Sequence, residues 1–101
     1  MEEETVNKEK INLEELLPGD IYEVINICIA MLAEQAWIQM GLHLNPATKE
    51  IKKDIQQASL AIDCLQSLIE KTEDKLDEKT KSEIKNLLSN LRLNFVQQSQ
   101  V

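Results

Sequence analysis

The stretch that decides the fold reads IYEVINICIAMLAEQAWIQMGL and runs from Ile21 to Leu42. Between Glu23 and Glu34 it carries one polar side chain, Asn26. On a helical wheel the two glutamates fall in one narrow stripe, and apolar side chains fill most of the remaining circumference. A surface helix has a single apolar face, so this helix is predicted to be covered on more than one side.

The residues that flank this stretch predict where its helix begins and ends. Asp20 is a predicted N-cap, and Glu23, three positions on, completes a capping-box pattern. Gly41 is suited to end the helix, because glycine adopts the left-handed conformation at little cost. We therefore expect the first helix from Ile21 to about Met40.

A bilayer is one candidate environment for so apolar a helix, but the sequence argues against insertion. A membrane span needs about 20 apolar residues, and the run between Asn26 and Glu34 is far shorter. Glu34 would lie in the hydrocarbon, and no Lys or Arg flanks either end as an anchor. A protein core and a partner molecule remain as candidates.

A second helix is predicted from Pro46 to about Thr72, with Asn45 as its N-cap and Pro46 in the first turn. Its apolar positions are spaced alternately by four and three residues, which is typical of a packed helical seam. These positions are Ile51, Ile55, Ala58, Ile62, Leu65 and Ile69.

A third helix is predicted from about Glu78 to Val96, with Asp77 as its N-cap. The connection to the second helix is short, which requires an antiparallel hairpin. The apolar face of the third helix comprises Ile84, Leu87, Leu88, Leu91 and Phe95.

Length and composition fit this all-α fold, a small bundle of three main helices with the first packed on the hairpin. A chain of 101 residues is one domain, and its few glycines and prolines lie between the periodic segments. We expect an acidic flexible arm at 1–19, a helical domain at 20–97 and a polar tail at 98–101. One short turn of helix is expected in the arm, ahead of Pro18.

The net charge of −7 comes from the first 45 residues, and the rest of the chain is neutral. No basic patch marks a nucleic-acid interface. The N-terminus lacks the basic and apolar regions of a signal peptide, so we expect a cytoplasmic protein. Cys28 and Cys64 have no metal-type spacing, and both are expected as reduced core residues.

No catalytic, cofactor or metal site is predicted. Glu23 and Glu34 lie about 16 Å apart along one helix, too far for a paired-carboxylate mechanism within one chain. The single histidine, His43, has no nucleophile motif or second ligand beside it. Asp54 and Arg92 are expected as a structural ion pair across the hairpin. Asp63 is either a solvated side chain or a polar contact to a neighbouring chain.

A two-helix hairpin covers one side of the first helix and leaves an apolar surface of a size that monomers rarely expose. We therefore expect a non-catalytic protein that forms homo-oligomers, most simply a dimer. Docking of the same helix on a different protein is the alternative, and an enzyme or metal site between subunits is a remote third. The predicted oligomer interface comprises Ile25, Ile29, Leu32, Ala36, Trp37 and Met40.

The segments MLAEQAWIQMGL, ASLAIDCLQSLIEKT and LLSNLRLNFV, with Pro46 and Leu76 between them, resemble a family of small bacterial proteins catalogued as domain of unknown function (DUF) 1844. The resemblance covers about three-quarters of the chain. It implies a small helical protein and brings no established activity. One departure is that Asp74-Lys75 stands where such proteins often carry Gly-Asn, so a different turn is expected there.

Overall fold

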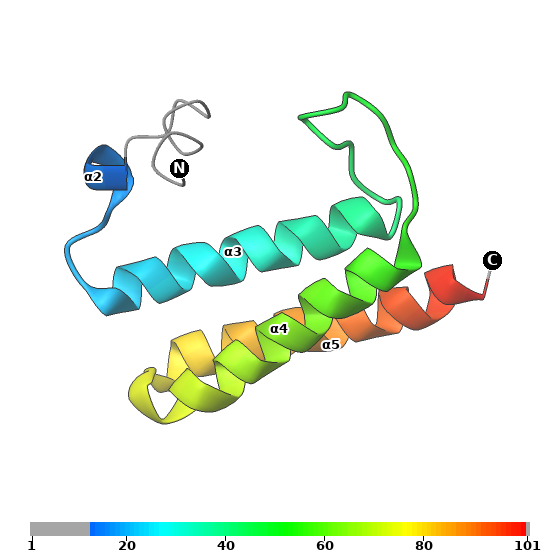
Figure 1. Cartoon of the computed structure of the whole chain (residues 1–101). Helices are drawn as coiled ribbons and strands as arrows, with labels where there is room; N and C mark the ends of the chain where they lie inside the picture. Colours follow the sequence, from blue (N-terminus) through cyan, green and yellow to red (C-terminus); the bar gives the residue numbers. More distant parts are fainter. Residues whose placement is uncertain (1–12, 101) are drawn as a thin grey trace.

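The structure is a computed structural model, and it describes residues 13–100. Three long helices pack together: α3 (Ile21–Gln39), α4 (Ile55–Thr72) and α5 (Glu78–Ser99) (Figure 1). Within residues 13–100 there is no β-strand, only an isolated bridge between Asn45 and Glu50. The predicted all-α bundle is confirmed.

Helix α4 is the central element of the bundle. It runs antiparallel to α3 and packs along most of that helix, and α5 returns beside α4 after the 3-10 turn η1 (Glu73–Lys75) (Figure 1). The contact between α3 and α5 is smaller than either of the contacts that α4 makes. The hairpin of α4 and α5 therefore supports α3 mainly through α4.

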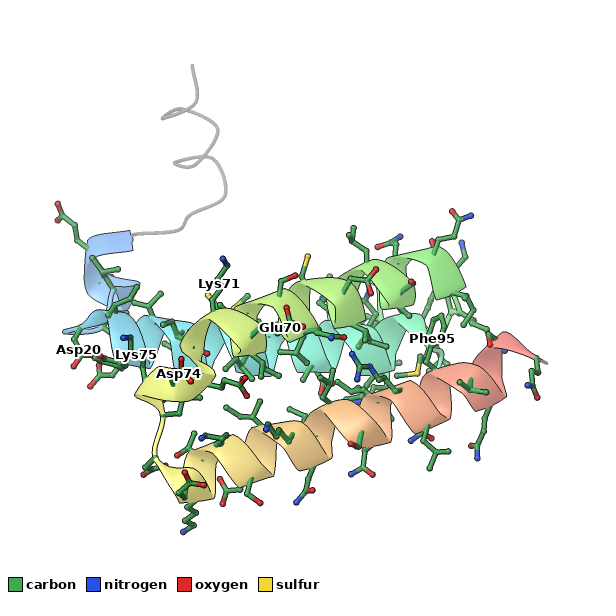
Figure 2. All side chains as sticks on the ribbon, turned by 90° about the horizontal axis from the view of Figure 1, so that it is seen from below. Asp20, Glu70, Lys71, Asp74, Lys75 and Phe95 are labelled. Carbon is green, nitrogen blue, oxygen red and sulfur yellow. The ribbon has the colours of Figure 1, made fainter. Side chains whose placement is uncertain are left out.

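The core lies where the three helices meet, and it is aliphatic. Ala33, Ala36, Ala58 and Ala61 are buried at the contact of α3 with α4, where small side chains let the two helices approach closely. The other buried residues of this cluster are Ile29, Met40, Ile62, Leu65, Ile69, Ile84, Leu88 and Leu91. Phe95 points from α5 toward this core and is half-buried (Figure 2).

Side-chain caps begin α3 and α5 as predicted. The Asp20 carboxylate accepts a hydrogen bond from the Glu23 backbone N–H at 3.0 Å. The Glu23 carboxylate in turn accepts from the Gly19 N–H at 3.2 Å, one residue earlier than in the usual capping box. Asp77 accepts from the Thr80 N–H at 2.8 Å.

The predicted start of the second helix at Pro46 is wrong, because α4 begins at Ile55. Asn45 caps a turn instead: its side-chain oxygen accepts from the N–H groups of Ala47 and Thr48 at 2.8 and 3.4 Å. This Asx-type turn gives the backbone a non-helical solution right after the asparagine. Asp54, whose carboxylate accepts from the Gln57 N–H at 3.2 Å, is the actual N-cap.

The shift of the helix start moves Ile51 out of the predicted seam. Ile51 lies in the loop and is exposed, whereas Ile55 opens α4 and is half-buried. The rest of the seam, from Ala58 to Ile69, is buried as expected. The apolar spacing was therefore informative only inside the helix itself.

Gly41 ends α3 in the left-handed conformation, with φ at +81°. Its N–H donates to the Ile38 carbonyl at 3.0 Å, and the Leu42 N–H donates to the Trp37 carbonyl at 3.1 Å. This pair of bonds is the Schellman motif, which satisfies the last carbonyls of a helix. A Cβ at Gly41 would lie 3.3 Å from the Cβ of Lys53, so the loop passes close by.

The two ends of the chain differ in part from expectation. The short helix α2 (Leu13–Leu16) stands ahead of Pro18, as the sequence predicts. Helix α5 continues to Ser99, two residues beyond the expected domain boundary at 97. The prediction of a mobile arm falls mostly on residues 1–12, which lie outside the described residues.

Candidate functional site

An open groove of about 530 Å³ runs between α3 and α4 on the outside of the bundle. Its walls are mostly apolar, and its polar side chains all belong to α4. We call it the α3–α4 groove. It is lined by Cys28, Leu32, Asp63, Cys64, Ser67, Leu68 and Lys71.

Exposed apolar side chains extend the groove over both helices. Met31 is 65% exposed and lies three residues after Cys28 on α3. Ile27 is 46% exposed and lies four residues before Met31. On α4, Leu60 is 64% exposed and precedes Cys64 by four residues. Exposed apolar side chains therefore accompany the apolar groove on both of its helices.

Both cysteines lie in this groove, which corrects the expectation that they are core residues. Cys28 and Cys64 are exposed, and neither forms a disulfide. Each belongs to the flank of its helix, beside the buried stripe formed by Ile29 on α3 and Leu65 on α4. Cysteine is usually buried in proteins, so two exposed thiols in one apolar groove are a departure from its usual placement.

The residues predicted as the oligomer interface mostly serve the bundle itself. Ile29, Ala36 and Met40 are buried in the core, and Ile25 and Trp37 are half-buried against it. Leu32 alone of the six lines the α3–α4 groove. The sequence showed correctly that α3 has two apolar sides, but without the packing partners it did not distinguish the inner side from the outer one.

The expected ion pair of Asp54 with Arg92 is not formed. Asp54 caps α4, and hydrogen bonds from the side chain and then the backbone of Gln57 lower the pKa of its carboxyl group. Within residues 13–100, Arg92 has no ion-pair partner within 4 Å. It lines a separate groove between α4 and α5 with Asp63 and Phe95. Asp54 serves as the N-cap because α4 begins at Ile55, directly after it.

A small polar cluster ties the loop after α3 back onto the helix. The Nδ1 atom of His43 lies 2.8 Å from Oε2 of Glu34, and the His43 ring stacks on Trp37 with the ring centroids 5.6 Å apart. All three come from the C-terminal part of α3 or the loop that follows. The three residues of this cluster include no Ser hydroxyl and no Cys thiol. Their contacts hold the loop after α3 against the helix.

The described part of the chain contains no group of three or more His, Cys, Asp or Glu side chains placed to hold a metal ion. Glu23 and Glu34, the two carboxylates that the sequence places on one helix, have separate partners. Glu23 completes the cap of α3, and Glu34 binds His43.

Helix α3 passes a length and hydropathy test for a membrane span, with about a fifth of the tested window buried in the bundle. The same test is passed by core helices of water-soluble proteins, which are mostly buried, and by signal sequences near an N-terminus. The inner side of α3 packs on α4 and α5, and Glu34 lies in the middle of the second half of the helix. An inserted α3 would lose that packing and place a carboxylate in hydrocarbon.

These features define a small helical protein with three long helices and an open apolar groove between two of them. The chain belongs to the family described as domain of unknown function (DUF1844), whose model matches residues 23–97. The match spans all three long helices and most of the groove's surroundings. No curated protein and no solved structure matches the chain.

Proposed function

We propose that this protein is non-catalytic and cytoplasmic, and that it acts as a homo-oligomer whose subunits associate through the α3–α4 groove. The observation that supports the proposal is the apolar α3–α4 groove together with the exposed side chains of Ile27, Met31 and Leu60 on the same two helices. Covering one large aliphatic side chain contributes about 1.5–3 kcal/mol, so covering several at once favours association strongly.

The distribution of charged side chains favours the α3–α4 groove as the interface. A second groove between α4 and α5, distinct from the one that Asp63 and Phe95 line, is bridged by an ion pair, with Lys85 Nζ 3.4 Å from Glu73 Oε1. That groove is also lined by Glu70 and Arg92, so a partner that covered it would remove four charged groups from water. The α3–α4 groove has only Asp63 and Lys71 as charged lining residues. Desolvation on association is therefore less costly at the α3–α4 groove than at the groove that holds this ion pair.

The proposed mode of action is protein–protein interaction by the assembled oligomer, with no cofactor, nucleic acid or membrane insertion required. The formal net charge of −7 per chain disfavours binding to nucleic acid or to anionic lipid. Association would place the outer side of α3 with the Cys28 thiol, and the Cys64 thiol of α4, in an interface.

The test is the molar mass in solution, measured by light scattering behind a sizing column over a hundredfold range of protein concentration. We expect twice the chain mass of 11.6 kDa, or a higher multiple, at the upper concentrations. A mass of 11.6 kDa at every concentration would contradict the proposal. The groove would then be assigned to a different protein, and a co-purifying subunit would be sought.

A further inference from the structure

Three polar residues of the groove form a row along the exposed side of α4. Asp63, Ser67 and Lys71 follow one another at intervals of four residues, and all three are exposed. Side chains four residues apart lie on one ridge of a helix, and such ridges pack into the grooves of a second helix. Lys71 extends from α4 on the side away from α5 (Figure 2).

The two charges of this row, Asp63 and Lys71, are unpaired among the described residues. Asp63 and Lys71 form no ion pair within 4 Å with any residue in the range 13–100. Eight residues separate them, which is about 12 Å along a helix axis, so they do not pair with each other. Arg92 lines the adjoining groove beside Asp63, yet it stays beyond ion-pair distance.

The row is self-complementary under two-fold symmetry. When two α4 helices cross antiparallel with Ser67 at the centre, each position meets the position equally far on the other side of that serine. Asp63 of one copy then faces Lys71 of the other, and the same contact occurs twice. The small Ser67 side chain lets the helices approach closely at the crossing point.

The apolar part of the groove supports the same arrangement. Leu60, Cys64 and Leu68 form the neighbouring four-residue ridge of α4, and Cys28 and Leu32 of α3 lie across the groove from it. A second α4 helix lying over Ser67 would also lie over this ridge. An apolar centre with opposite charges on either side is the usual layout of a specific interface.

We propose that the occupant of the α3–α4 groove is a second copy of this chain, placed by a two-fold axis at Ser67 with two reciprocal Asp63–Lys71 ion pairs. This inference rests on the proposed function and adds the orientation of the second copy and the charges that set its register. The charges select the antiparallel crossing, because a parallel crossing at Ser67 places Asp63 against Asp63 and Lys71 against Lys71.

The experiment reverses each charge alone and then both together. Asp63→Lys sets two lysines against each other at both contacts, and Lys71→Asp does the same with two aspartates. Each single reversal is expected to raise the dimer dissociation constant about tenfold or more at low salt. The double variant D63K/K71D restores opposite charges at both contacts, and its dissociation constant is expected to return to within about threefold of wild type.

An equimolar mixture of the two single variants sharpens the test. A heterodimer of the Asp63→Lys and Lys71→Asp chains has opposite charges at both contacts, so the mixture is expected to dimerise at concentrations where each variant alone is monomeric. Sedimentation velocity measures all of these species. Far-UV circular dichroism of each variant checks the fold, and Glu83→Lys with Lys79→Asp on exposed positions of α5 provide the matched charge controls.

The outcomes separate this inference from the proposed function. Weakening by both single reversals, with recovery in the double variant and in the mixture, supports the paired row. A wild-type dimer that neither reversal weakens overturns the Asp63–Lys71 contact and leaves self-association intact. Weakening without recovery in the mixture also overturns it. A wild-type protein that is monomeric throughout overturns both the pairing and the proposed function.

Discussion

The two sides of α3 have similar hydropathy and different surroundings. The inner side, with Ala33 and Ala36, is small, buried and fitted to α4. The outer side, with Ile27 and Met31, carries larger side chains that the three-helix bundle leaves exposed. Steric fit, and not hydrophobicity alone, therefore assigns one side to the core and leaves the other side exposed.

The largest expected effect breaks the inner contact. Leu65 on α4 is fully buried between the helices, so Leu65→Ala is expected to lower the free energy of unfolding by about 3 kcal/mol through lost packing and a residual cavity. Urea denaturation at fixed protein concentration measures the change. The control is Leu93→Ala on the exposed side of α5, which is expected to change stability by less than about 0.5 kcal/mol.

A second substitution compares the two sides of α3 directly. Ala36 is fully buried, and Ala30 on the same helix is exposed. Ala36→Leu is expected to cost about 1–3 kcal/mol by overpacking the contact with α4, whereas Ala30→Leu is expected to be nearly neutral. The stabilities of the two variants are compared by thermal unfolding, which circular dichroism monitors. Equal losses would contradict the assignment of inner and outer sides.

The end of α3 offers a smaller effect. Gly41→Ala places a side chain at positive φ and close to Lys53, and it is expected to cost about 1–2 kcal/mol. Gly19→Ala is the control, because nothing lies within 4 Å of its added Cβ and its φ is not positive. If the two variants unfold at the same urea concentration, the left-handed end of α3 does not contribute as described.

Acid pH is expected to weaken the hairpin of α4 and α5 through its caps. Hydrogen bonds from the Thr80 side chain and then its backbone lower the pKa of Asp77, as Gln57 lowers that of Asp54. A carboxyl group with a lowered pKa in the folded state stabilises the protein above its ordinary pKa of 3.8, and this stabilisation is lost as the pH falls through the lowered value.

The titration is measured as the thermal midpoint between pH 6 and pH 2.5. Asn caps a helix about as well as Asp and does not titrate in this range. Asp77→Asn is therefore expected to reduce the loss of midpoint in acid while leaving the midpoint at pH 6 close to that of wild type. An unchanged acid slope would show that the Asp77 cap does not carry the expected part of the pH dependence.

Local signals in the sequence predicted the parts of this fold that depend on neighbouring residues. The caps at Asp20 and Asp77 and the end at Gly41 are correct, because side-chain and backbone geometry within a few residues decides them. Asn45 shows the limit of this reasoning: asparagine caps helices and turns alike, and only the path of the loop toward Asp54 selects the turn.

The site was harder to predict than the fold. Wheel positions show that α3 is apolar on two sides, but the packing of α4 decides which side is inner. Cys28 and Cys64 looked like core residues by type, and their groove exists only once both helices are placed. The four-residue spacing of Asp63, Ser67 and Lys71 was visible in the sequence and gained meaning from the groove that they line.

The most direct test of the α3–α4 groove as the interface compares the molar masses of wild type and two double variants. All three are measured at one concentration at which wild type associates. Met31→Ser with Leu60→Ser removes apolar area beside the groove, and Leu93→Ser with Val96→Ser removes similarly exposed area on α5. We expect the groove variant to approach 11.6 kDa while wild type and the α5 variant stay at a multiple of it. One mass shared by all three would contradict the assignment of the groove as the interface.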